Sequence, residues 1–212
     1  MTTTAVTTAA HHLRLFYLHT YASETAAADA GVQRWQVSAE VLSEDGLPLA
    51  HLGEVHLVRA DPRGTAGLRA RLSAPDLGLA EEAEEAEEAE EAEATLDPGR
   101  EGPGAPRSGC LLYVAEARLC PEWSGLGLGV AMCALALCEL RFGCHRAICH
   151  PERVRRAAET SPGRGFAREE LAAAWPRLGF RPLANGVHAL DLTGDAFPRL
   201  VDRLLAGHDP PW

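Results

Sequence analysis

Glu116 has the clearest potential for chemistry, because it interrupts an otherwise apolar segment. The segment opens with Leu111, Leu112, Tyr113 and Val114, which is the pattern of a buried strand. A carboxylate in such a strand is a candidate for proton transfer to or from a bound ligand. The sequence therefore predicts a strand that carries one functional acid.

A glycine-rich turn follows this strand. Pro121 ends the strand because it has no N–H to donate, and Gly125, Gly127 and Gly129 alternate just before an apolar helical run over 130–140. Glycines let the backbone approach a bound group closely, and a helix start presents unpaired N–H groups and a positive dipole end. Such a strand–turn–helix is suited to binding a phosphate or pyrophosphate.

Two common phosphate-binding motifs do not fit this turn. A Rossmann fingerprint counted from Gly125 or Gly127 would need a third glycine where Val130 or Met132 stands. A Walker loop would need a Gly-Lys-Ser/Thr ending, and the run contains no lysine. The turn therefore belongs to neither class.

The turn resembles the acetyl-CoA-binding motif of the GNAT N-acetyltransferase superfamily, which reads Arg or Gln, two residues, Gly, one residue, then Gly or Ala. Ser124 stands at the Arg/Gln position, and Gly127 and Gly129 stand at the two small positions. LYVAEARLCPEW at 112–123 is similar to the family's fourth strand and its Pro-Glu exit. Arg-Leu-Gly-Phe at 177–180 resembles a late Leu-Gly-Phe motif of the family.

The resemblance covers residues 110–191, and it reaches the N-terminal third only through the strand pattern. It implies acetyl-CoA as the acyl donor, with its pyrophosphate on the backbone N–H groups of the turn and its pantetheine arm on the backbone of the strand end. The cofactor-binding residues expected on this basis are Leu119, Cys120, Ser124, Gly125, Leu126, Gly127, Leu128 and Gly129. The catalytic residue expected is Glu116, which matches a strand glutamate that often acts as the base. Glu54 is the second candidate for this role.

The chain departs from the family pattern at the expected proton donor to the leaving thiolate. Many members have a tyrosine there, whereas this chain has Trp175, whose N–H cannot serve as an acid. Cys149, His150 and Ser161 lie near the expected region without a matching motif. The acid is therefore either absent, because a thiolate can leave unaided, or unassigned. The segment over 20–33 is also too short for the two helices that usually form part of the acceptor wall.

Charge is concentrated in one insertion. The 212-residue chain has a net charge of −10, but nine glutamates lie within 81–93, so the remainder is nearly neutral. Neutrality argues against an electrostatic nucleic-acid binder, which needs a basic face. The insertion over 61–108 is expected to be a solvated or disordered acidic loop, with a docking element or a lid as the alternative.

The sequence also gives expectations about localisation and about metal binding. There is no apolar run of about 18 residues and no signal-peptide pattern at the N-terminus, so we expect a cytoplasmic protein without a membrane segment. The six cysteines form no C-x-x-C pair and lie in apolar stretches, so we expect reduced core residues. Cys144-His145 and Cys149-His150 could suggest zinc, but a strand between them would splay the ligands, so we expect no metal.

Together these patterns predict one mixed α/β domain with a GNAT-like, twisted, mostly antiparallel sheet flanked by helices. The expected parts are a disordered lead-in over 1–12, a domain over 13–193 and a C-terminal helix and tail over 194–212. The expected strands cover 13–19, 34–42, 49–59, 110–120, 146–150 and 186–192, and the expected helices cover 130–140, 166–175 and 195–205.

Two functions follow from these observations. The first is an acetyl-CoA-dependent N-acetyltransferase, whose acceptor is an amine on a small molecule, an antibiotic or a protein. The second is a non-catalytic GNAT-like protein that binds CoA or acts as a scaffold and uses the acidic insertion to bind a partner. A homodimer is compatible with either.

Overall fold

The computed structural model of the protein describes residues 2–7, 12–20, 32–60, 109–123, 125–152, 154, 168–182 and 186–206. The following predicted features lie wholly or largely outside these residues: the connecting segment over 20–33, the acidic insertion over 61–108, Ser124 in the glycine turn, Ser161, and the C-terminal tail over 207–212.

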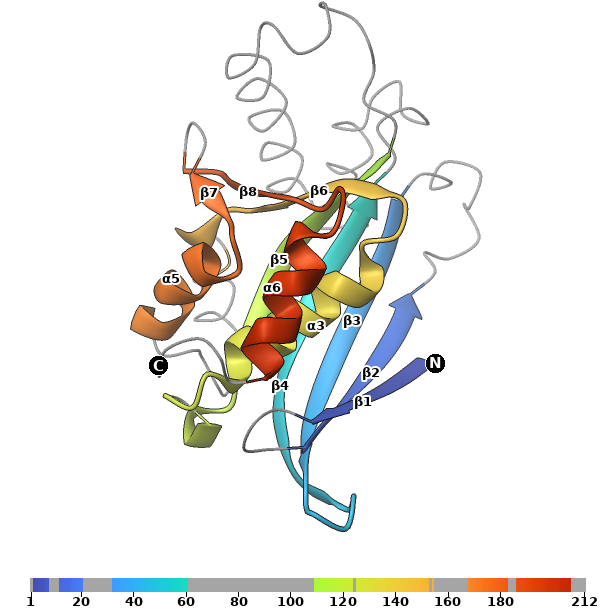
Figure 1. The fold of residues 1–212 in the computed structure, drawn as a ribbon, viewed down its shortest axis with the longest axis vertical. Coiled ribbons are helices and arrows are strands. Elements are labelled where there is room, and N and C mark those ends of the chain that lie inside the picture. Colours follow the sequence, from blue (N-terminus) through green and yellow to red (C-terminus); the bar gives the residue numbers. More distant parts are fainter. Residues whose placement is uncertain are drawn as a thin grey trace, which may run out of the picture.

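One sheet contains the described strands in the order β1-β2-β3-β4-β5-β6-β8-β7 (Figure 1). The strands are β1 Thr2–Thr7, β2 His12–Thr20, β3 Val32–Leu42, β4 Pro48–Ala60, β5 Cys110–Leu119, β6 Cys144–Cys149, β7 Arg181–Pro182 and β8 His188–Asp191. Neighbouring strands are antiparallel except for β5 and β6, which are parallel. This confirms the predicted mixed α/β class with a mostly antiparallel sheet.

The hairpin between β3 and β4 has the predicted turn at Asp45-Gly46. Gly46 has a φ of 76°, a left-handed conformation that glycine adopts without steric cost. The Ser43 N–H donates a hydrogen bond to the Leu47 carbonyl at 2.8 Å, which closes the turn. The hairpin pairs β4 with β3 along one edge, and β4 pairs with β5 along its other edge, where the candidate site lies.

The first strand differs from the sequence prediction. Residues 1–12 were expected to form a disordered lead-in, whereas Thr2–Thr7 form β1 and pair with β2 from Thr2↔Tyr17 to Thr7↔His12. The segment is rich in threonine, a β-branched residue that favours strands. The prediction of disorder rested instead on the small residues of the segment and on its lack of a hydrophobic pattern.

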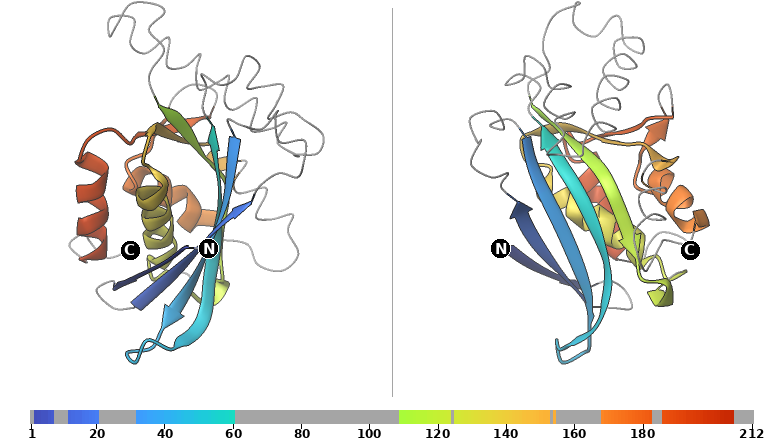
Figure 2. Two further views of the ribbon diagram at one scale, coloured as in Figure 1. Left: turned by 90° about the vertical axis from the view of Figure 1, so that its right-hand side faces the viewer. Right: turned by 180° about the vertical axis from the view of Figure 1, so that it is seen from behind.

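The described helices α3 Leu128–Leu140, α5 Arg168–Arg177 and α6 Ala196–Leu205 lie on one face of the sheet (Figure 2). A short 3₁₀ helix, η2 Pro121–Trp123, connects β5 to the glycine turn. The α5 helix runs past Trp175, where it was expected to stop, because Pro176 lies in its last turn and removes only one backbone donor. Among the described residues, no helix combines the length and hydrophobicity needed to cross a bilayer.

The main core lies between the sheet and these helices. It includes Leu57, Leu112 and Val114 from the strands and Met132 and Leu137 from α3. A smaller apolar cluster lies on the opposite face of the sheet and consists of Val58, Ala60, Leu111, Tyr113, Ile148 and Val187. We call this opposite face the outer face, because the described helices do not cover it.

Candidate functional site

The parallel strands β5 and β6 pair over only part of their length. Their pairing ends at Val114↔Cys149, while β5 continues along β4 as far as Gly53↔Leu119. Beyond Val114, β5 therefore has no strand partner on its β6 side within the described residues, and Figure 1 shows β6 turning away from β5. The C-terminal half of β5 thus has one backbone edge that a bound ligand can use.

The backbone N–H and carbonyl groups of Leu119 and Cys120 point to opposite sides of the β5 strand end. The Cys120 N–H donates to the Leu52 carbonyl at 2.8 Å, and the Cys120 carbonyl accepts from the Trp123 N–H at 3.0 Å. Since neighbouring residues in an antiparallel pair alternate between facing and not facing the partner strand, the N–H and carbonyl of Leu119 point away from β4. Of these two residues, Leu119 therefore has the backbone edge that suits an extended ligand.

The glycine turn leads from β5 into the start of α3. Gly125 and Gly127 have φ values of 77° and 69°, which is the left-handed region that favours glycine. The first backbone hydrogen bond of the helix runs from the Ala131 N–H to the Gly127 carbonyl at 3.1 Å, and no side chain caps the helix. The N–H groups of residues 128–130 therefore precede the intrahelical bonds and lie at the positive end of the helix dipole.

A bulge in β5 places Glu116 on the outer face. The register changes from His56↔Glu116 to Leu57↔Val114, so Ala115 has no opposite residue on β4. Val114 and Ala117 both belong to the main core, and strict alternation from Val114 would have directed Glu116 into that core. The extra residue shifts the alternation by one and turns the carboxylate outward.

Glu116 is held by Arg118, two residues further along the same strand. The Arg118 Nε donates a hydrogen bond to the Glu116 Oε1 at 2.6 Å, and the Arg118 guanidinium also forms an ion pair with this oxygen. The Glu116 side chain is only 13% exposed. Its second oxygen, Oε2, lies 3.5 Å from the Nδ1 of His56 on β4.

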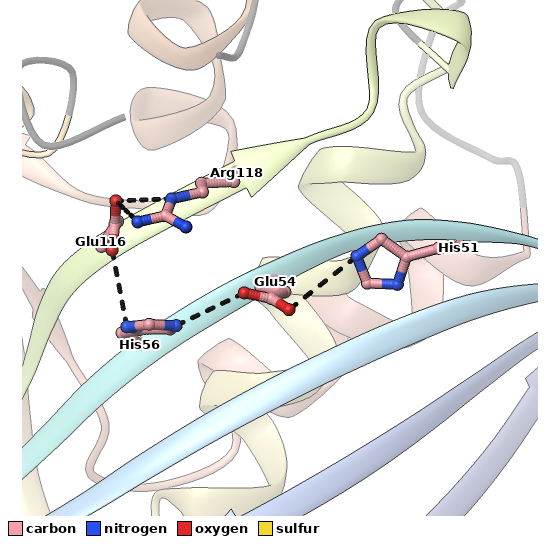
Figure 3. Close-up of polar contacts among 5 residues, drawn as sticks. All are labelled: His51, Glu54, His56, Glu116 and Arg118. Atoms are coloured by element: carbon pink, nitrogen blue, oxygen red, sulfur yellow. Dashed lines mark hydrogen bonds and ion pairs between the residues drawn. The ribbon is translucent and has the colours of Figure 1, made fainter. Parts of the chain in front are cut away.

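Glu54 and His51 extend this arrangement along β4. The His56 Nε2 lies 3.6 Å from the Glu54 Oε2, and the Glu54 Oε1 lies 4.0 Å from the His51 Nε2 (Figure 3). A second bulge, in the pairing of β3 with β4, places His51 on the same face as Glu54. The register changes from Ala39↔Gly53 to Glu40↔His51 and skips Leu52. We call His51, Glu54, His56, Glu116 and Arg118 the polar cluster.

The sequence predictions named two of these five residues. Glu116 and Glu54 were separate candidates for the base, and the structure brings them to either side of His56. His51, His56 and Arg118 were missed. The sequence does contain a signal for His56 and Arg118. Each lies two residues after a candidate glutamate, Glu54 or Glu116, and this spacing places both members of a pair on one face of a strand.

Trp175 is a core residue. Its side chain is fully buried, and its ring packs edge-to-face against Phe180 with 5.3 Å between the centroids. The indole N–H has no hydrogen-bond partner among the described residues.

Cys149 and His150, two of the other residues considered for the acid, lie where the pairing of β5 with β6 ends.

No family model matches the chain, and no curated protein or solved structure matches it either. In the described part of the chain, no group of three or more His, Cys, Asp or Glu side chains is arranged to hold a metal ion. The candidate site consists of the β5 edge, the start of α3 and the polar cluster.

His188 gives one prediction about stability. Burial lowers the pKa of His188 from 6.5, and His150 lowers this pKa further. As the pH falls below 6.5, the unfolded chain takes up a proton that the folded His188 resists, so stability is lost until the pH reaches the lower, folded pKa. We expect the wild type to lose more stability than His188→Gln in urea unfolding between neutral and mildly acidic pH. Parallel losses in the two proteins would contradict this.

The buried cysteines give a second prediction. The structure contains six free cysteines, and burial raises the pKa of Cys133 to about 12 and that of Cys144 to about 11. Since the thiolate is the reactive form, both thiols should resist alkylation by iodoacetamide in the native protein. Peptide mass spectrometry should show Cys133 modified only after denaturant is added. Rapid native labelling of Cys133 would contradict its assigned environment.

Proposed function

We propose that the chain is a GNAT-type N-acetyltransferase, which transfers the acetyl group of acetyl-CoA to an amine. The observation that carries this proposal is the divergence of β5 and β6 beyond Val114 and Cys149, next to a strand end that leads through two left-handed glycines into α3. An extended edge and a helix start are the two backbone features that suit an extended carrier with a diphosphate. The mostly antiparallel sheet is compatible with the GNAT fold.

Each part of acetyl-CoA has a matching feature in this reading. The pyrophosphate would accept hydrogen bonds from the N–H groups of residues 128–130, where the helix dipole favours negative charge. The pantetheine arm would lie along the open edge of β5 and use the N–H and carbonyl of Leu119, as an added strand does. The thioester would then approach the part of β5 that carries Glu116.

Glu116 supplies the base in this proposal. Amines are protonated at neutral pH, so the acceptor must lose a proton before it attacks the thioester carbonyl. The carbonyl carbon forms a bond to nitrogen, the bond to sulfur breaks, and CoA leaves as the thiolate, which takes up the second proton that the nitrogen loses and is released as the thiol. Arg118 holds the Glu116 Oε1 and keeps the carboxylate in place, and Oε2, which faces the His56 Nδ1, takes the proton.

A second function is favoured by a specific observation. Arg118 already pairs with Glu116, and Trp175 is buried in the core where many GNAT enzymes have a tyrosine. A protein that binds CoA without turning it over would retain the β5 edge and the α3 start while lacking a free base and an acid. This non-catalytic alternative predicts CoA binding without thiol release.

Two measurements test the proposal. Calorimetry should detect saturable binding of acetyl-CoA, and Gly127→Trp should abolish it because a bulky side chain is strained at a φ of 69° and blocks the turn. A free-thiol assay with alkylamines, arylalkylamines and lysine-containing peptides should then show amine-dependent release of CoA. Gly46→Trp is the matched control, because Gly46 also has a positive φ but lies in the distant β3–β4 turn. Equal binding by Gly127→Trp and the wild type would refute the binding site.

A further inference from the structure

We propose that His56, Glu54 and His51 form a proton path from Glu116 to solvent, with His56 as its central carrier. This inference rests on the proposed acetyl transfer and extends it to His56 and His51, which have no assigned role, and to Glu54, which was the second candidate for the base. In Figure 3 the four side chains form a continuous series in which carboxylates and imidazoles alternate.

The path begins at the oxygen of Glu116 that Arg118 does not hold. The hydrogen bond and the ion pair that Arg118 makes with Glu116 are both to Oε1, whereas Oε2 faces the His56 Nδ1 at 3.5 Å. The Glu116 side chain is 13% exposed, so a proton taken up there has little direct contact with water. A neighbouring group that can accept the proton would restore the carboxylate for the next turnover.

His56 has the chemistry and position for this transfer. Its two ring nitrogens face two different carboxylates, since Nδ1 points toward Glu116 and Nε2 lies 3.6 Å from the Glu54 Oε2. The Nε2 is buried and makes no hydrogen bond within the described structure, so no such bond must break before a proton moves. An imidazole can receive a proton at one nitrogen and release another from the second.

Glu54 and His51 lead outward from His56. The Glu54 Oε1 lies 4.0 Å from the His51 Nε2. The exposed fractions of the side chains are 13% at Glu116, 37% at His56, 27% at Glu54 and 43% at His51, so the three residues beyond Glu116 are all more exposed than it is. The separations of 3.5–4.0 Å exceed those of direct hydrogen bonds. Transfer therefore needs either a small closure of the side chains, as catalytic hydrogen bonds often show on substrate binding, or a bridging water.

The proton balance of the path is closed. Conversion of the acceptor ammonium to an amide releases two protons. The first goes to the Glu116 Oε2, and Glu116 passes it to the His56 Nδ1. His56 then releases a proton from Nε2 to Glu54, which passes it to His51 and water. The second leaves the nitrogen after attack and goes to the departing thiolate, so it does not use the path. No electrons move, and both carboxylates are ionised again once the proton reaches solvent. His56 is left with its proton on Nδ1 and regains its starting tautomer by proton exchange with water, to which its side chain is 37% exposed.

The surroundings of His56 provide a matched control. On β5 it faces Glu116, which Arg118 neutralises, and on β4 it faces Glu54. On β3 its register partner is the uncharged Gln36. Replacing Gln36 therefore changes a direct neighbour of His56 without removing a titratable group.

The experiment compares His56→Ala, His51→Ala and Gln36→Ala in the thiol-release assay, using the amine that gives the highest turnover with the wild type. We expect His56→Ala to lower kcat by about 100-fold with little change in the KM for acetyl-CoA, since general acid–base groups contribute about 10²–10⁴-fold. Added imidazole should restore much of this loss, which a purely structural role would not allow. His51→Ala should lower kcat less, and Gln36→Ala should leave it unchanged.

The possible failures are distinguishable. If the wild type releases no thiol with any amine, the proposed function fails and the proton path fails with it. If the wild type is active and His56→Ala matches it, only the path is overturned. A loss of activity in His56→Ala that imidazole does not restore also overturns it, provided the variant keeps the thermal unfolding midpoint of the wild type. Should His56→Ala fail to fold, His56→Gln takes its place in the same assay.

Discussion

Glu116→Gln is expected to lower kcat for acetyl transfer by about 10²–10³-fold, because glutamine keeps the shape of the side chain but cannot accept the acceptor's proton. The amide oxygen can still accept a hydrogen bond from Arg118, so the contact that positions the side chain at 2.6 Å is retained in part. The dissociation constant for acetyl-CoA should stay within a few-fold of the wild-type value, since the binding features lie at Leu119 and at the start of α3. Thiol release and calorimetry measure the two quantities separately.

Arg118→Gln is the companion variant. It removes the cation that holds the Glu116 Oε1 and leaves the carboxylate able to accept a proton. We therefore expect a smaller loss of kcat than in Glu116→Gln, because the base is present but no longer held in place. Unchanged turnover in Glu116→Gln would mean that the carboxylate only pairs with Arg118, and it would favour the non-catalytic alternative.

The elements around the site could be predicted because their signals are local. Pro121 and the glycines of the turn mark the end of β5 and the start of α3, and Asp45-Gly46 marks the β3–β4 hairpin. Proline and glycine constrain the backbone wherever they occur, so these predictions do not depend on tertiary contacts. The strand over Thr2–Thr7 was missed because it depends on pairing with β2 rather than on a pattern of its own.

The partners of Glu116 could not be predicted for a different reason. The contact with His56 depends on the register between β4 and β5, which is a property of the folded sheet. The bulge at Ala115 and the skipped residue Leu52 each shift the alternation by one, so a two-residue period read along either strand assigns some side chains to the wrong face. The different backbone directions of Leu119 and Cys120 depend on the same register.

Trp175→Ala is expected to lower the free energy of unfolding by about 3–5 kcal/mol, the range for removing a large aromatic side chain from a packed core. Trp175 is fully buried, and its ring meets Phe180 edge-to-face at 5.3 Å, so the truncation leaves a cavity and removes an aromatic contact. Urea denaturation of the two proteins measures the difference. A loss below about 1 kcal/mol would contradict the core assignment.

Trp175→Phe separates this structural role from a catalytic one. Phenylalanine retains an aromatic ring against Phe180 and removes the indole N–H, which has no hydrogen-bond partner among the described residues. The variant should therefore lose less stability than Trp175→Ala, because it leaves a smaller cavity and no unpaired donor. Its kcat should equal that of the wild type, since the indole N–H does not protonate the leaving thiolate. A large fall in kcat with an unchanged unfolding midpoint would instead place Trp175 in the reaction and require a contact between its ring and bound acetyl-CoA.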